Sequence, residues 1–186
     1  MPSVLDDFRI DGPLLDTFAK TIQVKTVKKG TILQQNSRTA KAFFVQKGCL
    51  RSYTIDAKGK EHIFMFAPEG WILSDVTLHA AQGMPPLFVD ALEDSEIEVF
   101  DGHLLDELTV SGYIQSGLLT EKLFRRIAVL QKRVLLLMSA NALERYKDFI
   151  ETYPNIVQRV PQRMIASYLG ITPEALSKIR NERVKK

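Results

Sequence analysis

The sequence predicts an α+β protein in which a strand-rich N-terminal half is followed by helices. Three observations support this prediction. Short β-type runs alternate with turn residues between positions 23 and 100, the hydrophobic spacing becomes helical from about position 104, and residues 159–186 carry the pattern of a helix-turn-helix. At 186 residues, with 45% hydrophobic and 25% charged, the chain suits one globular unit of ordinary size plus a smaller one.

The strand-rich half contains seven runs with the length and composition of strands: QVKTV, TILQQ, AFFVQKG, CLRSYTI, EHIFMFA, LFVDAL and EIEVF. Gly, Pro or charged turns separate them at intervals typical of an antiparallel roll or sandwich. The tetrapeptide DAKG at 56–59 predicts a hairpin turn. Helical spacing over residues 1–20, interrupted at 11–13, adds an N-terminal helix. We therefore expect a β-roll domain over residues 1–110.

A long helix is predicted near residues 113–138, which contain no proline. One apolar stripe follows a three–four spacing through Thr120, Leu123, Ile127, Leu130, Val134 and Leu137. A second stripe holds Phe124, Ala128, Leu135 and Met138. A helix that is apolar on two faces is buried on two sides. We expect one face on the strands and the other on a second copy, which makes residues 111–138 a dimerisation helix; burial within a single chain is the alternative.

The C-terminal segment, residues 139–186, is predicted to hold a capped helix and then the helix-turn-helix. Ser139 is the expected cap of the helix that ends before Pro154, and a hinge is expected at Met138–Ser139. Gly170 marks the turn of the helix-turn-helix, and Ala166 is small enough for two helices to pack closely. The shared interior is predicted from the apolar residues Ile165, Leu169, Ile171, Leu176 and Ile179. An ordinary helical hairpin in a core is the alternative.

The second helix of this motif has a well-defined predicted start. Thr172 is the expected N-cap, Pro173 the first helical residue, and Glu174 an acid in the first turn.

The distribution of charge predicts a polyanionic partner for the C-terminal end. Residues 156–186 hold seven Lys or Arg and two acids, a net charge of +5, whereas the whole chain is only +3. A basic end on a slightly acidic body favours DNA as the partner. In contrast, no Lys or Arg occurs between Lys60 and Lys122, a stretch that contains twelve acids.

The cysteine and histidine content gives little support to a disulfide, an iron–sulfur cluster or a metal site. Cys49 is the only cysteine, so an internal disulfide and an iron–sulfur cluster are excluded. The histidines His62, His79 and His103 are not spaced as a ligand pair, and we expect no metal site and no enzyme. A haem bound through Cys49 or a histidine stays open. No apolar run approaches a membrane span and the N-terminus does not look like a signal peptide, so we expect a cytoplasmic protein with no membrane partner.

The order of a strand roll, a long helix and a terminal helix-turn-helix resembles the Crp-Fnr superfamily of bacterial transcription regulators, over about residues 20–183. The segments KKGTILQQ and AFFVQKGCLRSYTIDAKGKEHIFMFAPEGWI are similar to its cyclic-nucleotide-binding roll, with Gly30, Gly48, Gly59 and Gly70 at the turns. SANALERY and RVPQRMIASYLGITPE look like a compact subgroup of these regulators. The resemblance implies a sensor of a small molecule and a homodimer that presents two recognition helices to an inverted-repeat operator, with RNA polymerase as a further candidate partner.

The resemblance also implies residues for a cyclic nucleotide, and here the sequence departs from the family pattern. Ser74-Asp75 stand where a Gly-Glu pair would take the ribose, and MPPLF at 84–88 stands where an Arg run would neutralise the phosphate. Pro85 and Pro86 have no backbone N–H to offer a phosphate. We therefore expect a small-molecule effector other than cyclic AMP, and no certain cofactor.

The candidate effector pocket comprises aromatic and turn residues of this region: Phe64, Gly70, Trp71, Ser74, Asp75, Pro85, Pro86 and Phe88. Burial of these aromatics in an ordinary core is the alternative. Arg51, Arg125 and Arg126 do not match the family's phosphate motif, and whether they reach the pocket is left open.

The resemblance implies base reading by the first turns of the recognition helix, at Pro173, Glu174, Ser177 and Lys178. Glu174 is expected to accept from a cytosine amino group and Lys178 to donate to guanine, while Pro173 stands where an Arg often reads a base. The full set expected at DNA is Gln162, Arg163, Thr172, Pro173, Glu174, Ser177, Lys178, Arg180 and Asn181. Exposed helix residues without a partner are the alternative, and for Glu174 the helix dipole alone is a sufficient reason.

Family members usually add a strand hairpin wing after the recognition helix, and the sequence up to Lys186 is not expected to form one. Lys185 and Lys186 are expected to replace part of its phosphate contacts. The rival prediction for the whole chain is a ligand-binding or protein-interaction module with weak or vestigial DNA binding.

Overall fold

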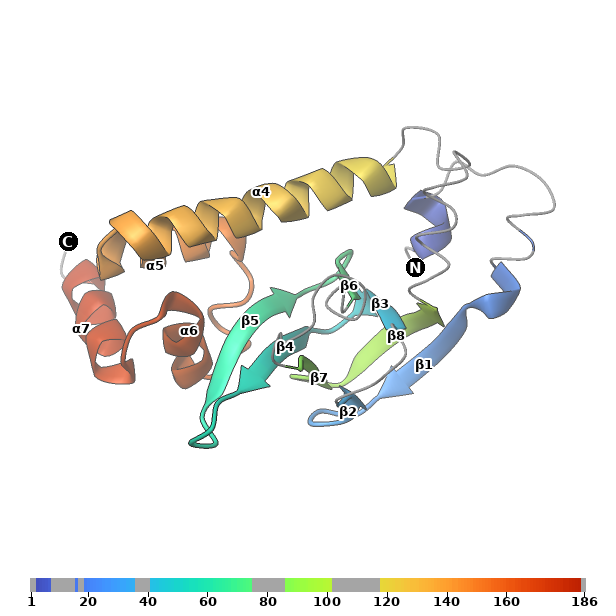
Figure 1. Ribbon diagram of the computed structural model, residues 1–186, viewed down its shortest axis with the longest axis horizontal. Helices are drawn as coiled ribbons and strands as arrows, with labels where there is room; N and C mark the ends of the chain where they lie inside the picture. Colours follow the sequence, from blue (N-terminus) through green and yellow to red (C-terminus); the bar gives the residue numbers. More distant parts are fainter. Residues whose placement is uncertain are drawn as a thin grey trace.

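The computed structural model describes residues 3–7, 16, 19–35, 41–74, 86–101 and 118–184. A short 3-10 helix, η1 (Val4–Asp7), precedes the strands. Figure 1 shows the strands in the middle of the molecule, with the helices that follow them along one side and at one end. The strands are β1 (Gln23–Val27), β2 (Ile32–Gln34), β3 (Lys41–Lys47), β4 (Leu50–Ile55), β5 (Glu61–Ala67), β6 (Ile72–Ser74), β7 (Phe88–Ala91) and β8 (Ser95–Asp101).

These strands form two four-stranded antiparallel sheets, which confirms the predicted roll. One sheet has the order β1-β8-β3-β6 and the other β2-β7-β4-β5. Apolar side chains from both sheets, among them Phe43, Val45, Leu50, Val89 and Ile97, form a core between them. All seven predicted runs become strands. Strand β6 was not predicted, because its three residues are too few to show an alternating pattern.

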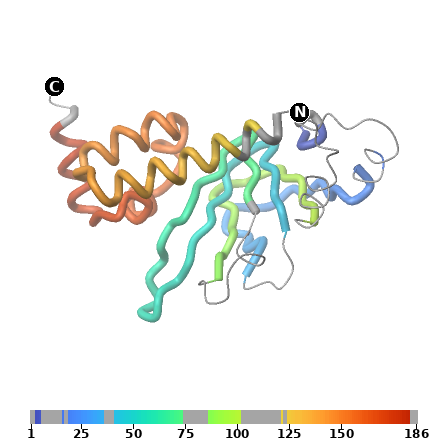
Figure 2. The backbone as a smooth tube through the Cα atoms, turned by 45° about the horizontal axis from the view of Figure 1, so that its top comes forward, coloured from blue at the N-terminus to red at the C-terminus, as the bar shows by residue number. Residues whose placement is uncertain are grey.

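The turn predicted at 56–59 joins β4 to β5 as a long hairpin. The N–H of Gly59 donates to the carbonyl of Asp56 at 2.9 Å, and the N–H of Asp56 donates to the carbonyl of Lys60 at 3.0 Å. Gly59 has φ +78°, a conformation in which a side chain would be strained. In Figure 2 this hairpin projects away from the body of the molecule as a narrow arm.

Helix α4 (Leu118–Ser139) confirms the predicted long helix but lies on the roll through an unexpected face. Its half-buried residues are Arg126, Val129, Leu130, Arg133 and Leu136. The side chains of Thr120 and Leu123 lie outside the described part of the chain. The other residues of the two predicted stripes are exposed, except Leu130; Phe124 is 66%, Val134 55%, Leu135 63% and Met138 79% exposed. The prediction that one of these stripes packs on the strands is therefore wrong: the half-buried side of α4 combines apolar residues with Arg126 and Arg133, which hydrogen-bond to carbonyls of the roll.

Helix α5 (Ala142–Thr152) begins two residues later than expected. Asn141, not Ser139, is its N-cap: the Asn141 side chain accepts from the N–H of Glu144 at 3.0 Å, and the Glu144 carboxylate accepts from the N–H of Asn141 at 2.9 Å. The Ser139 hydroxyl instead donates to the carbonyl of Leu135 within α4. This reciprocal pair is a capping box, which satisfies two helix-end donors together.

Helices α6 (Gln162–Leu169) and α7 (Pro173–Val184) form the predicted helix-turn-helix. Gly170 takes the left-handed conformation at φ +66° and ends α6. Thr172 caps α7, since its hydroxyl accepts from the N–H of Ala175 at 3.2 Å. Ile165, Ala166, Leu169 and Leu176 are buried, as expected for the shared interior.

The helix-turn-helix and the roll share one hydrophobic core. Cys49, Tyr53, Ile63 and Phe66 from the roll pack with residues of α5, α6 and α7 and of the segment between α5 and α6. The centre of this core is aromatic: the ring centroid of Phe66 lies 6.0 Å from Phe149 and Tyr153 and 5.6 Å from Tyr168. Figure 1 shows α6 beside β5, at one end of the β2-β7-β4-β5 sheet, with α7 on the far side of α6.

In the described ranges, none of the helices is long and apolar enough to cross a membrane.

Candidate nucleic-acid interface

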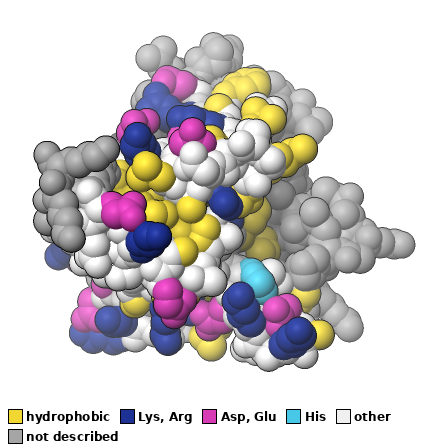
Figure 3. Space-filling view, turned by 90° about the vertical axis from the view of Figure 1, so that its left-hand side faces the viewer, with side chains coloured by type: hydrophobic (Ala, Val, Ile, Leu, Met, Phe, Trp, Pro, Cys, Tyr) yellow, Lys and Arg dark blue, Asp and Glu magenta, His cyan; other side chains and the backbone are white. Residues whose placement is uncertain are grey.

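The residues predicted to meet DNA share one exposed end of the molecule. Figure 3 views this end, with Lys and Arg side chains distributed over it. Of the nine predicted residues, Arg180 is half-buried and the other eight are exposed: Gln162, Arg163, Thr172, Pro173, Glu174, Ser177, Lys178 and Asn181. The structure thus brings the predicted set together on α6, α7 and the turn between them, while Lys185 and Lys186 lie outside the described residues.

The first turn of α7 already has internal partners for its acid. Hydrogen bonds from its own backbone N–H and from the Thr172 hydroxyl lower the pKa of Glu174. An ionised carboxylate at this position also interacts favourably with the helix dipole. Glu174 therefore has a structural reason to be present, and a contact with cytosine would compete with these hydrogen bonds.

The N-terminus of α6 presents backbone donors beside a basic side chain. Pro161 is the N-cap and contributes no side-chain hydrogen bond to the helix end. Gln162 and Arg163 follow it and are exposed. Free N–H groups at a helix start attract anions such as phosphate, so this end of α6 has the chemistry of a backbone-phosphate contact.

Helix α6 is held on the roll through the outer edge of β5, the last strand of its sheet. The Ser167 hydroxyl accepts from the N–H of Ile63 at 3.0 Å and donates to the carbonyl of Glu61 at 3.1 Å. A strand edge offers unpaired backbone groups, and a covering element must satisfy them. Ser167 does so on a helix that also packs its buried face against β5.

Arg133 of α4 satisfies the remaining carbonyls at this junction. Its guanidinium donates to Phe64, to Ile63 at 3.1 Å and to Tyr168 at 3.0 Å, and its Cζ lies 4.0 Å from the centre of the Tyr168 ring. Desolvation lowers the pKa of Arg133 from its ordinary value. One side chain thus joins the long helix, the sheet edge and the end of α6.

The turn of the helix-turn-helix abuts the C-terminal part of α4. Arg145 Nη1 donates to the carbonyl of Leu169 at 2.8 Å. A Cβ atom placed on Gly170 would lie 3.3 Å from Leu137 Cδ2 and 3.4 Å from Arg145 Nη1. Gly170 is therefore required by its backbone conformation and by the close approach of two neighbouring helices.

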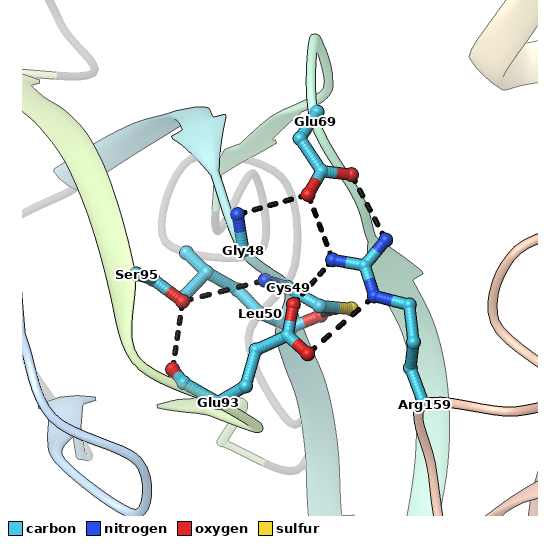
Figure 4. A network of polar contacts seen from close by, with 7 residues as sticks. All are labelled: Gly48, Cys49, Leu50, Glu69, Glu93, Ser95 and Arg159. Atoms are coloured by element: carbon cyan, nitrogen blue, oxygen red, sulfur yellow. Dashed lines mark hydrogen bonds and ion pairs between the residues drawn. The ribbon is translucent and has the colours of Figure 1, made fainter.

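Arg159, counted with the basic end in the sequence, pairs with acids of the roll. Figure 4 shows its guanidinium between Glu69 and Glu93; its Nη1 and Nη2 lie 3.0 and 2.8 Å from the Glu69 carboxylate oxygens, and Nη2 also pairs with Glu93. Glu69 accepts a further hydrogen bond from the N–H of Gly48 at 2.9 Å. The interpretation of Arg159 as part of a DNA-facing charge is therefore wrong, because its charge is already compensated within the chain.

Cys49 lies beneath this network, with its thiol buried. Its N–H donates to the Ser95 hydroxyl and its side chain is buried. Desolvation raises the pKa of the thiol to about 12 despite the nearby charge of Arg159. Since the thiolate is the nucleophile and the ligand form of cysteine, this residue is poorly suited to catalysis or metal binding at neutral pH.

The described members of the predicted effector pocket are mainly packing residues. Trp71 lies 5.4 Å from Tyr153 between ring centroids, and Phe88 stacks on Tyr53 at 5.4 Å. Phe64 and Gly70 are half-buried and Pro86 is exposed. The side chain of Ser74, and Asp75 and Pro85 as a whole, lie outside the described residues. The contacts of Trp71 and Phe88 favour the alternative in which these aromatics are core.

The three arginines left open as phosphate partners have other contacts. Arg51 is 7% exposed and donates to Asp90 at 2.7 and 2.8 Å and to Glu61. Arg126 donates to the carbonyl of Ile72 at 3.2 Å, and Arg125 pairs with Glu121 one helical turn away. A buried guanidinium held by two carboxylates is not available to a ligand phosphate without losing those pairs.

Among the described residues, no group of three or more His, Cys, Asp or Glu side chains is arranged to hold a metal ion.

Several solved structures have a fold similar to that of this chain. The chain matches a CooA variant from Carboxydothermus hydrogenoformans with 21% identity over 98% of this chain and 83% of that one, at a TM-score of 0.69. It matches a Eubacterium rectale protein assigned to the Crp/Fnr family of transcriptional regulators with 14% identity over 95% and 85%, at a TM-score of 0.63. The chain has the Crp-Fnr fold. The c-di-GMP-responsive regulator CLP of Xanthomonas campestris is similar as well, with 10% identity over 92% and 91% and a TM-score of 0.67. No family model and no curated protein sequence matches the chain.

Within this Crp-Fnr fold, sequence reasoning missed the residues that join the helix-turn-helix to the roll. Ser167, Arg133 and Arg159 each contact groups at least 35 residues away in the sequence. One signal was present in the sequence: two arginines, Arg126 and Arg133, occur seven residues apart on the long helix and so share a face. Arginines at this spacing can occupy a contact face as well as a solvated one.

Proposed function

We propose that the protein is a ligand-responsive transcription regulator that binds an inverted-repeat DNA operator as a homodimer. The observation that carries the proposal is the exposed face of a capped helix-turn-helix at the end of a Crp-Fnr fold. On that face Lys178 and Ser177 lie on α7, with Arg163 at the uncapped start of α6. Base reading by α7 and phosphate binding by α6 are the roles that this motif performs in DNA recognition.

Homodimerisation is supported by the uncovered apolar side of α4. Phe124, Val134, Leu135 and Met138 are each more than half exposed. Figure 3 shows exposed hydrophobic side chains at the upper part of the molecule, the level at which α4 lies in Figure 1. A contiguous apolar surface on one helix favours a self-complementary contact with a second copy. Two helix-turn-helix motifs related by a two-fold axis would bind a DNA operator that is an inverted repeat.

The effector is proposed to be a small molecule other than cyclic AMP. Arg51 is held by Asp90 and Glu61, and Arg126 donates to Ile72, so neither offers an uncommitted guanidinium. CLP, which shares the fold, is described as responsive to c-di-GMP. An enzymatic activity is not part of the proposal, since the buried, protonated Cys49 is a poor nucleophile.

Selection of binding sites from random DNA duplexes by the full chain tests the proposal. We expect enrichment of an inverted repeat whose half-site centres lie about 10 base pairs apart or a multiple of that spacing. The variant Lys178→Ala should relax the preference at one base pair in each half-site, at a cost of about 1–3 kcal/mol. Lys25→Ala, in β1 of the roll, is the matched control.

Absence of any enriched inverted repeat, together with unchanged DNA retention in Lys178→Ala, would contradict the regulator proposal. That result would favour a ligand-binding or protein-interaction module with vestigial DNA binding.

A further inference from the structure

We infer that the tip of the β4–β5 hairpin is a second DNA-backbone contact, which works beside the helix-turn-helix of the same protomer. We call residues 56–62 the hairpin arm. The inference rests on the proposed DNA-binding function and adds to it a contact from the sensor roll. It assigns a role to a feature that the sequence showed only as a turn.

The hairpin arm and the helix-turn-helix form the two walls of one open groove of about 760 Å³. Gly59, Lys60, Glu61, His62 and Ile63 line it on one side. The other side is formed by residues of α6, the turn and the start of α7, namely Arg163, Met164, Ser167, Gly170, Ile171, Thr172 and Pro173. The arm therefore lies against the end of the helix-turn-helix at which backbone phosphates are expected.

The position of the arm is fixed at its base and within its turn. Ser167 of α6 holds the base through Ile63 and Glu61. Within the turn, the Asp56 carboxylate accepts from the N–H of Lys58 at 2.9 Å and from that of Lys60 at 3.0 Å. An element that is ordered before binding loses less conformational entropy when it contacts a ligand. The arm is thus suited to hold its lysines beside α6 and α7.

Both acids of the arm pair with side chains other than those of the two lysines. Glu61 pairs with Arg51 at 2.5 Å, and Asp56 pairs with the His62 ring at 2.8 Å. The hydrogen bond from His62, with those from the backbone of Lys60 and Lys58, lowers the pKa of Asp56 to about 2. Lys58 and Lys60 are exposed. Figure 3 shows this mixture of basic, acidic and histidine side chains at the lower edge of the face.

A polyanion that runs along the helix-turn-helix fits this arrangement better than a small acidic group. Arg163 on one wall and Lys60 on the other line the same groove, with Lys58 further out along the arm. Successive phosphates of a DNA strand present one negative charge every few ångströms, and each Lys or Arg that neutralises one releases counterions. The hairpin arm would therefore extend the phosphate contacts beyond those of α6 and α7 without reading bases.

The test compares operator binding by the double variant Lys58→Ala/Lys60→Ala with that of Lys25→Ala/Lys29→Ala. The control removes the same charge from exposed lysines at β1 and the turn after it, on the other sheet. We expect the arm variant to bind the selected operator about tenfold more weakly at moderate salt. The slope of log K against log salt should also fall by about one to two units relative to the control. Lys58→Arg/Lys60→Arg should retain wild-type binding.

The outcomes separate this inference from the proposed function. If the wild type and the arm variant bind the operator with the same affinity and the same salt slope, the arm contact alone is overturned. Tighter binding by the arm variant also overturns it, and would indicate that the arm obstructs DNA. Absence of inverted-repeat binding by the wild type overturns the proposed function and the arm contact with it. Hydroxyl-radical footprints should show the protection at flanking phosphates lost only in the arm variant.

Discussion

Arg159 and Glu69 form a bidentate ion pair, with N–O distances of 2.8 and 3.0 Å. It joins the segment that precedes α6 to the turn that connects β5 with β6. Glu93, after β7, pairs with the same guanidinium. The helix-turn-helix is therefore attached to the roll by charge at one point, in addition to the aromatic core and the edge of β5. A network of this kind is partly exposed to solvent, so its contribution to stability is modest.

Arg159→Gln is expected to lower the free energy of unfolding by about 1 kcal/mol at pH 7, the upper end for exposed pairs, because two carboxylates share one cation. Desolvation opposes ionisation of Glu69, but hydrogen bonds from Arg159 and from backbone N–H groups outweigh it and lower its pKa. A lowered folded-state pKa stabilises the protein above the unfolded-state pKa of about 4.3, and this contribution is lost as pH falls through the folded value.

The difference between wild type and Arg159→Gln should therefore shrink as the pH falls from 5 to 3, as measured by urea unfolding. A difference that is independent of pH would show that the Glu69 pair does not stabilise the fold.

Arg133→Met is expected to lower the free energy of unfolding by about 2–3 kcal/mol, since three carbonyls in a half-buried junction lose a charged donor. Met retains much of the side-chain length. Arg125→Met on the same helix is the control, because its pair with Glu121 is exposed and is expected to contribute less than about 0.5 kcal/mol. Equal effects of the two variants in denaturant unfolding would contradict the role of Arg133 as a junction residue.

Gly170→Ala should destabilise the protein more than Gly30→Ala. Both residues have a positive φ, +66° and +82°, and a side chain in this conformation costs about 1–2 kcal/mol. A Cβ on Gly30 meets nothing within 4 Å, whereas one on Gly170 lies 3.3 Å from Leu137 Cδ2, which must shift by a few tenths of an ångström. We expect a further loss of about 1 kcal/mol for Gly170→Ala from overpacking, and weaker operator binding. Thermal unfolding of the two variants, side by side, measures the difference.

Leu135→Glu is expected to convert the protein from dimer to monomer while the fold is retained, because Leu135 is 63% exposed within one chain and contributes to the uncovered face of α4. A buried, unpaired charge at a dimer contact is strongly unfavourable. Asn155→Glu adds the same charge at an exposed turn and should leave the assembly unchanged. Sedimentation equilibrium decides the matter: a wild type that is monomeric, or a Leu135→Glu variant that dimerises as tightly, contradicts the proposed dimer helix.

Local patterns predicted the elements well where the physical cause is itself local. Strand alternation, the hairpin turn at Gly59 and the start of α7 at Thr172 depend on neighbours within a few residues. The cap of α5 was assigned two residues too early, because a Ser and an Asn lie close together and both residues can cap a helix. The predicted contact face of α4 was wrong for a different reason. Hydrophobic spacing identifies apolar stripes, but it does not reveal that arginines make the contact with the roll.

The residues expected to meet DNA were predicted from their position in a motif. The structure places them together at one exposed end, and their contact with DNA stays a prediction. The effector pocket was harder to predict, because aromatic residues such as Trp71 and Phe88 serve a core as readily as a cavity.

The sequence by itself determined the succession of roll, long helix and helix-turn-helix, since periodicity, caps and glycine turns act over short distances. Only the tertiary structure decided which charges remain for a partner. The sequence counts Arg159 and Lys60 alike as positive, yet Arg159 is neutralised by Glu69 and Glu93, while Lys60 lines the groove beside α6. Coulomb pairing depends on distances of a few ångströms, which folding sets between residues up to 90 positions apart. The end proposed to bind DNA is thus smaller in charge than its composition suggests, and the proposed contact of the hairpin arm would extend it.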